Sequence, residues 1–287
     1  MIKGIILDID GVIVGEKIGF NSPNPNIAVL DRLKQISASG IPVVLCTAKP
    51  HFSITSIING ANLNNYHITD GGGVIINQIE NEIVKKHVID TNLANQVLSM
   101  YLDNNVYTEF YTVDNYVVQD NQVCGITKQH SHILQCEPKL VSSLVDESNL
   151  SEITKIMPIA LNEEDKLRVT ELFELLGTGL VLSWGVHPVA LPLQFGIITA
   201  PNISKKQAAI MIMKKLNIPF DNVLGVGDST SDWQFIELCK YGGAMENAND
   251  KLKELVLSKG NGFSLVGGHV DDNGIIEILD YFINKSN

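Results

Sequence analysis

Residues 4–12, Gly-Ile-Ile-Leu-Asp-Ile-Asp-Gly-Val, constrain the fold of this chain more than any other stretch. An apolar run that is rich in Ile and bounded by Gly is typical of a buried strand. Side chains alternate across a strand, so we expect Asp8 and Asp10 on the same side of its carboxyl end. Two carboxylates there are costly unless a cation or hydrogen bonds compensate them. A simpler interpretation is a turn at Asp10-Gly11, and the later motifs decide between the two.

Strands and helices alternate through the first 87 residues. The apolar pattern predicts a helix over residues 26–39, a buried strand over 41–46 that ends at Thr47, and a helix near 52–59. A strand at 67–69 and a hairpin of 74–77 with 82–88 follow. This alternation predicts an α/β fold with a doubly wound, mostly parallel, Rossmann-like sheet.

The pattern changes after residue 88. Helices are predicted over 91–103 and 163–176, and strands over 106–113, 116–118, 153–161, 179–184 and 188–193, while 128–136 stays ambiguous. We therefore expect residues 88–195 to form an inserted α+β domain. Residues 1–87 and 196–287 then form the core into which it is inserted.

The last third of the chain carries further polar residues at strand ends and helix starts. Ser204 is a natural N-cap, which places Lys205 in the first turn of the next helix, where lysine and helix dipole together favour an anion. Asp228 follows a short apolar strand, and Asp232 lies four residues further on. The simpler interpretation is that the lysines are solvated on a surface helix, which we prefer for Lys206. For Asp228 and Asp232 the simpler interpretation is that each caps the start of a helix.

Carboxylates that converge at one edge of the sheet repel one another. At 4 Å and an effective dielectric of 20, each like-charge pair costs about 4 kcal/mol. A divalent cation removes that cost, and a set of oxygen ligands without His or Cys indicates Mg²⁺ rather than Zn²⁺. Mg²⁺ typically binds one or two carboxylates, waters and a substrate phosphate, whose other oxygens Lys205 and the amino end of its helix would hold.

Composition excludes several classes of partner. The net charge of −11 disfavours nucleic acid and anionic membranes, which require basic patches. We expect a small-molecule partner, no nucleic acid and no membrane, and a monomer or homodimer. Four widely spaced cysteines and an N-terminus without a leader-like pattern predict a reduced, cytoplasmic protein.

Four motifs together resemble the haloacid dehalogenase-like superfamily. They are Asp8-Ile9-Asp10-Gly11, Thr47 after an apolar strand, Lys205 opening a helix, and Gly227-Asp228-Ser229-x-x-Asp232. The insertion resembles the large α/β cap of the Cof-type, sugar-phosphatase-like branch, as does Ala244-Met245-Glu246-Asn247-Ala248. The resemblance spans nearly the whole chain and implies a phosphatase.

By resemblance, Asp8 is the nucleophile that accepts the phosphoryl group. Asp10 is the general acid for the leaving oxygen and then the base for water. Thr47 and Lys205 hold the phosphoryl oxygens. An acid at position 10 favours a phosphatase over a dehalogenase, which needs no such proton donor.

The resemblance also implies a Mg²⁺ site and substrate contacts. The predicted metal residues are Asp8, Asp10 through its backbone carbonyl, Asp228 and Asp232. The predicted substrate-binding residues are Thr47, Ala48, Lys205 and Asn247. The branch usually has Gly-Arg where this chain has Ala48-Lys49, a difference that bears on which substrate is accepted.

The predicted substrate is a small phosphorylated metabolite, foremost a sugar phosphate. Two alternatives stay open at this point. A phosphomutase or phosphotransferase would share the first step and pass the phosphoryl group to a sugar. A non-catalytic phosphoaspartate signalling or binding protein is also doubly wound with clustered acids, although it needs neither the insertion nor a proton from Asp10.

Overall fold

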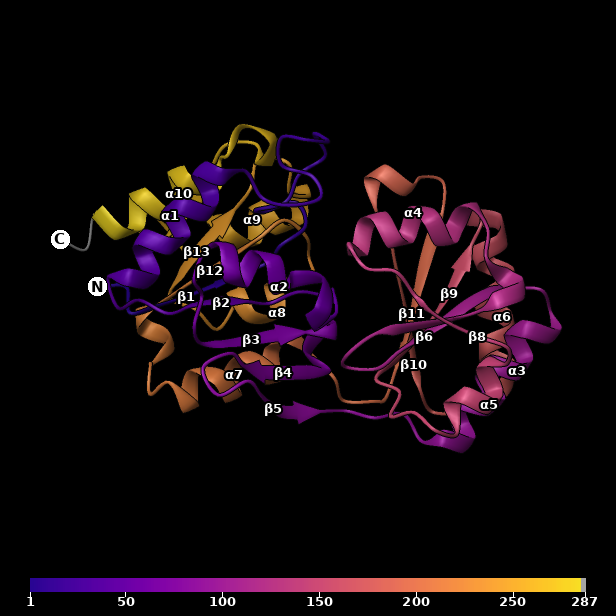
Figure 1. Ribbon diagram of the computed structural model, residues 1–287. Helices are drawn as coiled ribbons and strands as arrows, with labels where there is room; N and C mark the ends of the chain where they lie inside the picture. The colour runs from indigo at the N-terminus through magenta and orange to yellow at the C-terminus, as the bar shows by residue number, and fades with distance from the viewer. Residues whose placement is uncertain (285–287) are drawn as a thin grey trace. The chain divides into compact units, whose positions relative to one another are not determined.

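A computed structural model describes residues 1–284, which divide into two compact units (Figure 1). Unit 1 comprises Met1–Lys49, Ile54–Lys85 and the chain from Ser204 onward. Unit 2 comprises Pro50–Ser53 and Lys86–Ile203. Among the described residues, no helix has the length and apolar character that crossing a membrane requires.

A five-stranded parallel sheet forms the centre of unit 1. Its strand order is β14-β13-β12-β1-β2. The strands are β1 (Gly4–Leu7), β2 (Val43–Leu45), β12 (Val223–Gly227), β13 (Tyr241–Ala244) and β14 (Ser264–Val266). Leu7 is in register with Val226 on one side and Leu45 on the other, so these three strands end at the same edge.

Helices cover both faces of this sheet. Apolar side chains of α7 (Lys205–Lys215), α8 (Trp233–Ile236) and α9 (Asp250–Leu257) pack in one cluster with Ile6 and Val44. On the other face, α10 (Ile275–Asn284) lies against Gly243 through Ile278 and packs beside α1 (Ile27–Ala38). Because side chains alternate along a strand, the wholly apolar strands β1 and β2 require this double cover.

A second, antiparallel sheet extends unit 1 beyond β2. It consists of β3 (Tyr66–Thr69), β4 (Val74–Asn77) and β5 (Glu82–Lys86), and α2 (His51–Gly60) precedes it. One parallel bridge, Cys46 with Ile68, joins it to β2. The predicted third parallel strand is therefore present, but it pairs mainly with the hairpin strand β4.

Unit 2 is built on a six-stranded sheet of order β10-β11-β9-β6-β7-β8. Its pairings are antiparallel except for β7 with β8. The strands are β6 (Tyr107–Tyr111), β7 (Tyr116–Gln119), β8 (Lys139–Val141), β9 (Lys155–Ala160), β10 (Val181–Gly185) and β11 (Gln194–Thr199). Side chains of α3 (Thr91–Asp103), α5 (Leu144–Ser148) and α6 (Glu163–Leu176) share one apolar cluster, and those of α4 (Gly125–Leu134) belong to another.

The predicted α/β class agrees with this architecture, and two elements of the prediction change. The strand expected over 188–193 is wrong, because Pro188–Ala190 is a 3₁₀ turn and β11 is the partner of β10. Pro188 and Pro192 carry no backbone N–H for a ladder, which explains why the strand begins only at Gln194. The ambiguous stretch 128–136 is mostly helix, as part of α4.

Candidate active site

Three functional candidates follow neighbouring parallel strands of unit 1. Asp8 follows β1, Thr47 lies just beyond β2, and Asp228 follows β12. Asp8 N–H donates to Val226 O at 3.1 Å, which continues the β1–β12 ladder into the site. Because β1 ends at Leu7, Asp8 and Asp10 both lie beyond the strand. The parallel sheet therefore assembles the site at its carboxyl edge, where open α/β sheets bind ligands.

Three aspartates of unit 1 form an acid cluster. One carboxylate oxygen each of Asp8, Asp228 and Asp232 lies within 4.8 Å of the others, and Asp8 and Asp232 are buried. Oxygen ligands alone are the donor set that Mg²⁺ prefers. The residues present thus fit a magnesium ion.

Lys205 is the cation buried in this cluster. Its Nζ donates to Asp8 Oδ2 at 2.9 Å and to Asp232 Oδ1 at 2.7 Å, and only 6% of the residue is exposed. Ser204 caps α7 by accepting from Gln207 N–H, which fixes the first turn that carries Lys205. Gly72 lies against this turn at φ +104°, where an added Cβ would lie 2.4 Å from Ser204 O. Gly72 therefore lies directly against the start of the helix that carries Lys205.

Asp232 is fully buried and holds the loop after β12. Its Oδ2 accepts from the N–H groups of Asp228 (3.1 Å) and Ser229 (3.0 Å) and from the Ser229 hydroxyl (3.1 Å). Burial raises the pKa of Asp232, but the Lys205 charge and hydrogen bonds from Asp8, Lys205 and Ser229 N–H outweigh it, so the pKa lies below its ordinary value. Asp232 therefore remains a carboxylate that orients Asp228.

The other two members of the acid cluster resist ionisation. Burial, reinforced by the Asp232 carboxylate, raises the pKa of Asp8 well above its ordinary value against the lowering effect of Lys205. Burial and Asp232 likewise raise the pKa of Asp228 to about 7. For Lys205, burial lowers the pKa, but Asp8 and Asp232 outweigh it and the lysine stays charged. A cation bound here would relieve this repulsion.

Asp10 lies in the turn that follows β1. Its Oδ1 is 3.2 Å from Lys49 Nζ, and its carboxylate is not part of the acid cluster. Gly11 has φ +75°, and an added Cβ would lie 2.1 Å from Asp228 Oδ2, so this position requires glycine. The Asp10–Lys49 ion pair was not predicted. The signal was present, because Lys49 lies just beyond the end of β2, the strand beside β1.

The remaining predicted residues occupy different environments. Thr47 is 1% exposed, and its hydroxyl accepts from Lys49 N–H at 3.1 Å. Ala48 is exposed. Asn247 uses both ends of its amide on backbone groups: Nδ2 donates to Gly11 O at 2.8 Å, and Oδ1 accepts from Val270 N–H at 3.0 Å. Asn247 thus lies at the turn that carries Asp10.

Unit 2 contains a buried polar cluster that the sequence did not reveal. Glu109 is 0% exposed, and its Oε1 accepts from the Tyr111 hydroxyl at 2.5 Å and lies 2.8 Å from His130 Nδ1. The Nζ of Lys155, itself 1% exposed, lies 4.1 Å from the centre of the Tyr111 ring. Glu109 and Lys155 sit within apolar strand segments, so only the tertiary structure groups them with His130.

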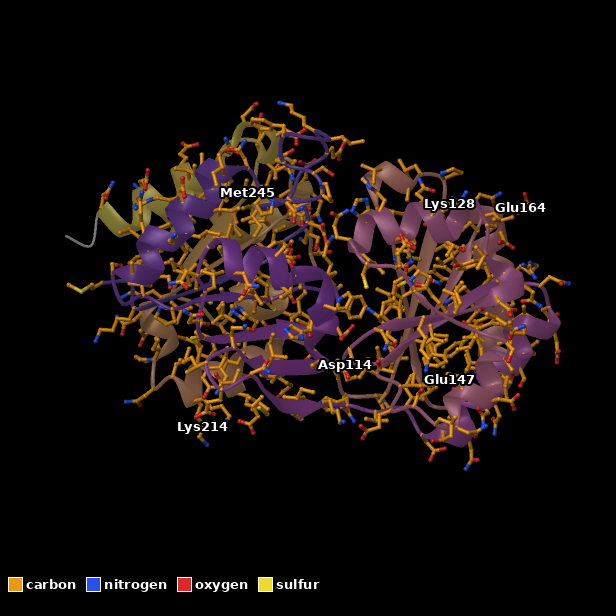
Figure 2. All side chains as sticks on the ribbon, in the orientation of Figure 1. Asp114, Lys128, Glu147, Glu164, Lys214 and Met245 are labelled. Atoms are coloured by element: carbon orange, nitrogen blue, oxygen red, sulfur yellow. The ribbon has the colours of Figure 1, made fainter. Side chains whose placement is uncertain are left out.

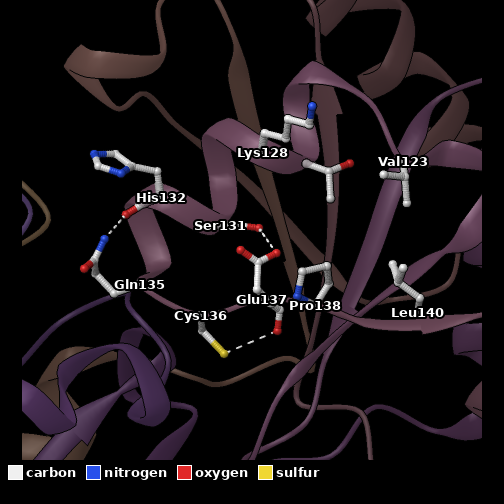
Figure 3. A pocket seen from close by; sticks show the side chains of 10 residues that line it. Val123, Lys128, Ser131, His132, Gln135, Cys136, Glu137, Pro138 and Leu140 are labelled. Atoms are coloured by element: carbon white, nitrogen blue, oxygen red, sulfur yellow. Dashed lines mark hydrogen bonds between the residues drawn. The ribbon is translucent and has the colours of Figure 1, made fainter.

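Unit 2 also contains a pocket of about 620 Å³ beside α4 (Figure 3). Lys128, Ser131 and His132 of α4 line it together with Glu137, whose Oε2 accepts from the Ser131 hydroxyl at 3.3 Å. Figure 2 shows Lys128 on α4 of unit 2 and Met245, which directly follows β13 of unit 1. None of the residues lining this pocket belongs to the acid cluster, so we do not identify it with the chemical centre.

Comparisons with known proteins agree with this geometry. The family described as haloacid dehalogenase-like hydrolase matches residues 5–279. Phosphatase YwpJ of Bacillus subtilis (strain 168) is 26% identical over 277 residues, which cover 88% of this chain and 92% of that protein. A haloacid dehalogenase-like hydrolase from Bacteroides thetaiotaomicron superposes with a TM-score of 0.81 at 18% identity, over 98% of this chain and 99% of that one. The subclass IIB sugar phosphatase BT4131 gives 0.74 at 21% identity, over 98% of both chains.

The chain therefore belongs to the haloacid dehalogenase-like hydrolase family. The predicted family and fold class are confirmed. Within the family the chain is a phosphatase, which confirms the predicted enzyme class.

Proposed function

We propose that this phosphatase hydrolyses a small phosphorylated metabolite, foremost a sugar phosphate, with Mg²⁺ and through an aspartyl-phosphate on Asp8. One observation carries the proposal. Asp8, Asp228 and Asp232 gather within 4.8 Å, and Lys205 donates to two of them. Phosphate-ester hydrolysis is among the slowest uncatalysed reactions, so it needs charge compensation of this density.

The proposed metal ligands are the carboxylates of Asp8 and Asp228 and the backbone carbonyl of Asp10. Asp232 belongs to the same site and supports it, because its Oδ2 already accepts three hydrogen bonds from the Asp228–Ser229 loop. When bound, Mg²⁺ supplies positive charge that offsets the carboxylates and the phosphate oxygens.

In the first step, an Asp8 oxygen attacks phosphorus and the bond from phosphorus to the leaving oxygen breaks. Asp10, in its acid form, gives its proton to that oxygen, so an alcohol leaves rather than an alkoxide. The Lys205 ammonium and the Thr47 hydroxyl hold the phosphoryl oxygens. The product is an acyl phosphate, with the phosphoryl group bonded to the Asp8 carboxylate oxygen.

In the second step, water attacks the same phosphorus atom. Asp10, now a carboxylate, takes a proton from the water, and the bond between phosphorus and the Asp8 oxygen breaks. Inorganic phosphate leaves, and both aspartates return to their starting forms. Splitting the reaction in this way replaces one difficult displacement by two easier ones.

We propose that the predicted cap, residues 88–195, selects the leaving group and excludes water during the reaction. The buried polar cluster of Glu109, Tyr111 and His130 supports this role, because polar groups of this density are expensive in a purely structural domain. The sugar-phosphatase name of BT4131 favours a sugar as the leaving group.

The test is phosphate release from a panel of sugar phosphates, with Mg²⁺ and with chelator. We expect release that depends on Mg²⁺ and falls at least about 10³-fold in Asp8→Asn. Asp31→Asn is the control, because Asp31 is exposed on α1. Undiminished activity of Asp8→Asn would refute the nucleophile, and transfer to an added sugar in place of water would show a phosphotransferase.

A further inference from the structure

The turn that carries Asp10 is held from two sides. On one side Gly11 lies against Asp228, so close that an added Cβ would fall 2.1 Å from Oδ2. On the other side Asn247 Nδ2 donates to Gly11 O at 2.8 Å. Gly11, the residue that follows Asp10, is therefore held between a proposed metal ligand and an asparagine.

Asn247 is itself anchored at its other end. Its Oδ1 accepts from Val270 N–H at 3.0 Å, in the turn Val270–Asp272. Asn21, which is 1% exposed, donates from Nδ2 to Val270 O at 3.1 Å and to Asp271 Oδ1 at 3.0 Å. Asp271 Oδ1 also accepts from Glu16 N–H at 2.9 Å. The whole loop from Gly11 to Asn21 is thus tied to one late turn of the chain.

We propose that Asn247 is a positioning residue for Asp10, which it holds at the leaving oxygen through Gly11, and that Val270 is its anchor. This inference rests on the proposed function, in which Asp10 is the general acid. Both ends of the Asn247 amide are committed to backbone groups, which favours positioning over contact with substrate. A shift of about 1 Å in a catalytic group can cost on the order of 10²-fold in rate.

A misplaced general acid has a distinctive kinetic signature. An alkyl phosphate needs a proton on its leaving oxygen, whereas p-nitrophenyl phosphate releases a stable phenolate without one. Loss of Asn247 should therefore slow the first step much more for alkyl phosphates than for p-nitrophenyl phosphate. A defect in folding, metal binding or the nucleophile would slow both substrates alike.

The experiment measures kcat/KM, which reports the first step alone, for an alkyl phosphate and p-nitrophenyl phosphate at saturating Mg²⁺. The variants are Asn247→Ala, Asn247→Asp, which keeps the acceptor for Val270 and loses the donor to Gly11, and Asp10→Asn as the reference. Asn65→Ala is the matched control: Asn65 is 6% exposed, and its Nδ2 donates to Val43 O at 3.0 Å, at the opposite end of β2 from Thr47.

We expect both Asn247 variants to lose about 10- to 10²-fold in kcat/KM on the alkyl phosphate and less than about 3-fold on the aryl phosphate. Asn65→Ala should leave the ratio between the two substrates unchanged. If Asp10→Asn is selective and neither Asn247 variant is, the positioning role is wrong. If Asp10→Asn lowers kcat/KM equally for both substrates, the general-acid assignment fails instead.

Discussion

Replacing Lys205 by Met tests the electrostatics of the acid cluster. Lys205 is buried and donates to Asp8 at 2.9 Å and to Asp232 at 2.7 Å. Methionine keeps much of the side-chain volume and removes the charge and both hydrogen bonds. Two carboxylates then stay buried without their counter-ion, which is the costly way to break a buried ion pair.

The expected loss is about 3–5 kcal/mol of unfolding free energy at pH 8 in metal-free protein. The pH dependence has a definite sign. Lys205 lowers the pKa of Asp232, so its stabilising effect is present above the ordinary aspartate range, near 4, and is lost in acid. Without Lys205 the Asp8 and Asp232 pKa values rise, and protonation relieves the repulsion. The loss should shrink from pH 8 to pH 5, by up to about 1.4 kcal/mol per pH unit for each proton bound.

The chain offers a specific probe, because it has two tryptophans, one in each unit. In a Trp184→Phe background, the fluorescence of Trp233 on α8 reports unfolding of unit 1 alone. The measurement is urea unfolding with chelator at pH 5 to 8. The control is Lys206→Met, whose partner Glu237 lies 2.7 Å away in an exposed pair, and which should cost no more than about 1 kcal/mol.

Two results would refute this reasoning. One is a loss below about 1 kcal/mol at pH 8, equal to that of Lys206→Met. The other is a loss that stays constant from pH 8 to pH 5, because the two buried carboxylates would then not be its cause.

Three further predictions concern single positions. Gly11→Ala should abolish detectable activity and weaken Mg²⁺ binding, since its Cβ would overlap the Asp228 carboxylate. The control is Gly40→Ala, at φ +88° with no atom within 4 Å of the added Cβ, which should cost only about 1–2 kcal/mol of stability. Equal effects of the two substitutions on activity and Mg²⁺ binding would contradict the close approach of Gly11 to Asp228. Because burial raises the pKa of Asp228 to about 7, above its unfolded value near 4, metal-free protein should lose stability as pH rises through 7. Calorimetry should correspondingly show Mg²⁺ affinity falling by up to about tenfold per pH unit below 7, and a flat profile would exclude a proton on the metal site. Asn162→Ala removes the acceptor for Asp165 N–H at the start of α6 and should destabilise unit 2 by about 0.5–2 kcal/mol. Urea unfolding is followed through Trp184 in a Trp233→Phe background. An unchanged unfolding midpoint would show that this helix N-cap contributes nothing to the stability of unit 2.

Local sequence determined many of the secondary-structure elements. The run before Asp8 forms β1 over Gly4–Leu7, and α3 and α6 occupy the predicted ranges, because each begins with a capping side chain, Asp90 or Asn162. These elements depend on burial pattern and capping, both of which are short-range. Elements without such signals were missed: β8 and α5 are short, and α4 has a Cys124 cap.

The sequence by itself determined which residues are at strand ends and helix starts, since that information lies within a few neighbouring positions. Only the tertiary structure decided what they meet there. It places Lys205 between Asp8 and Asp232, Lys49 beside Asp10, and the Asn247 amide on the Gly11 carbonyl. These contacts join residues up to 236 positions apart, and no local pattern specifies them. The register of a buried parallel sheet and the packing of its helices specify these contacts, because they fix where each chain segment ends in space.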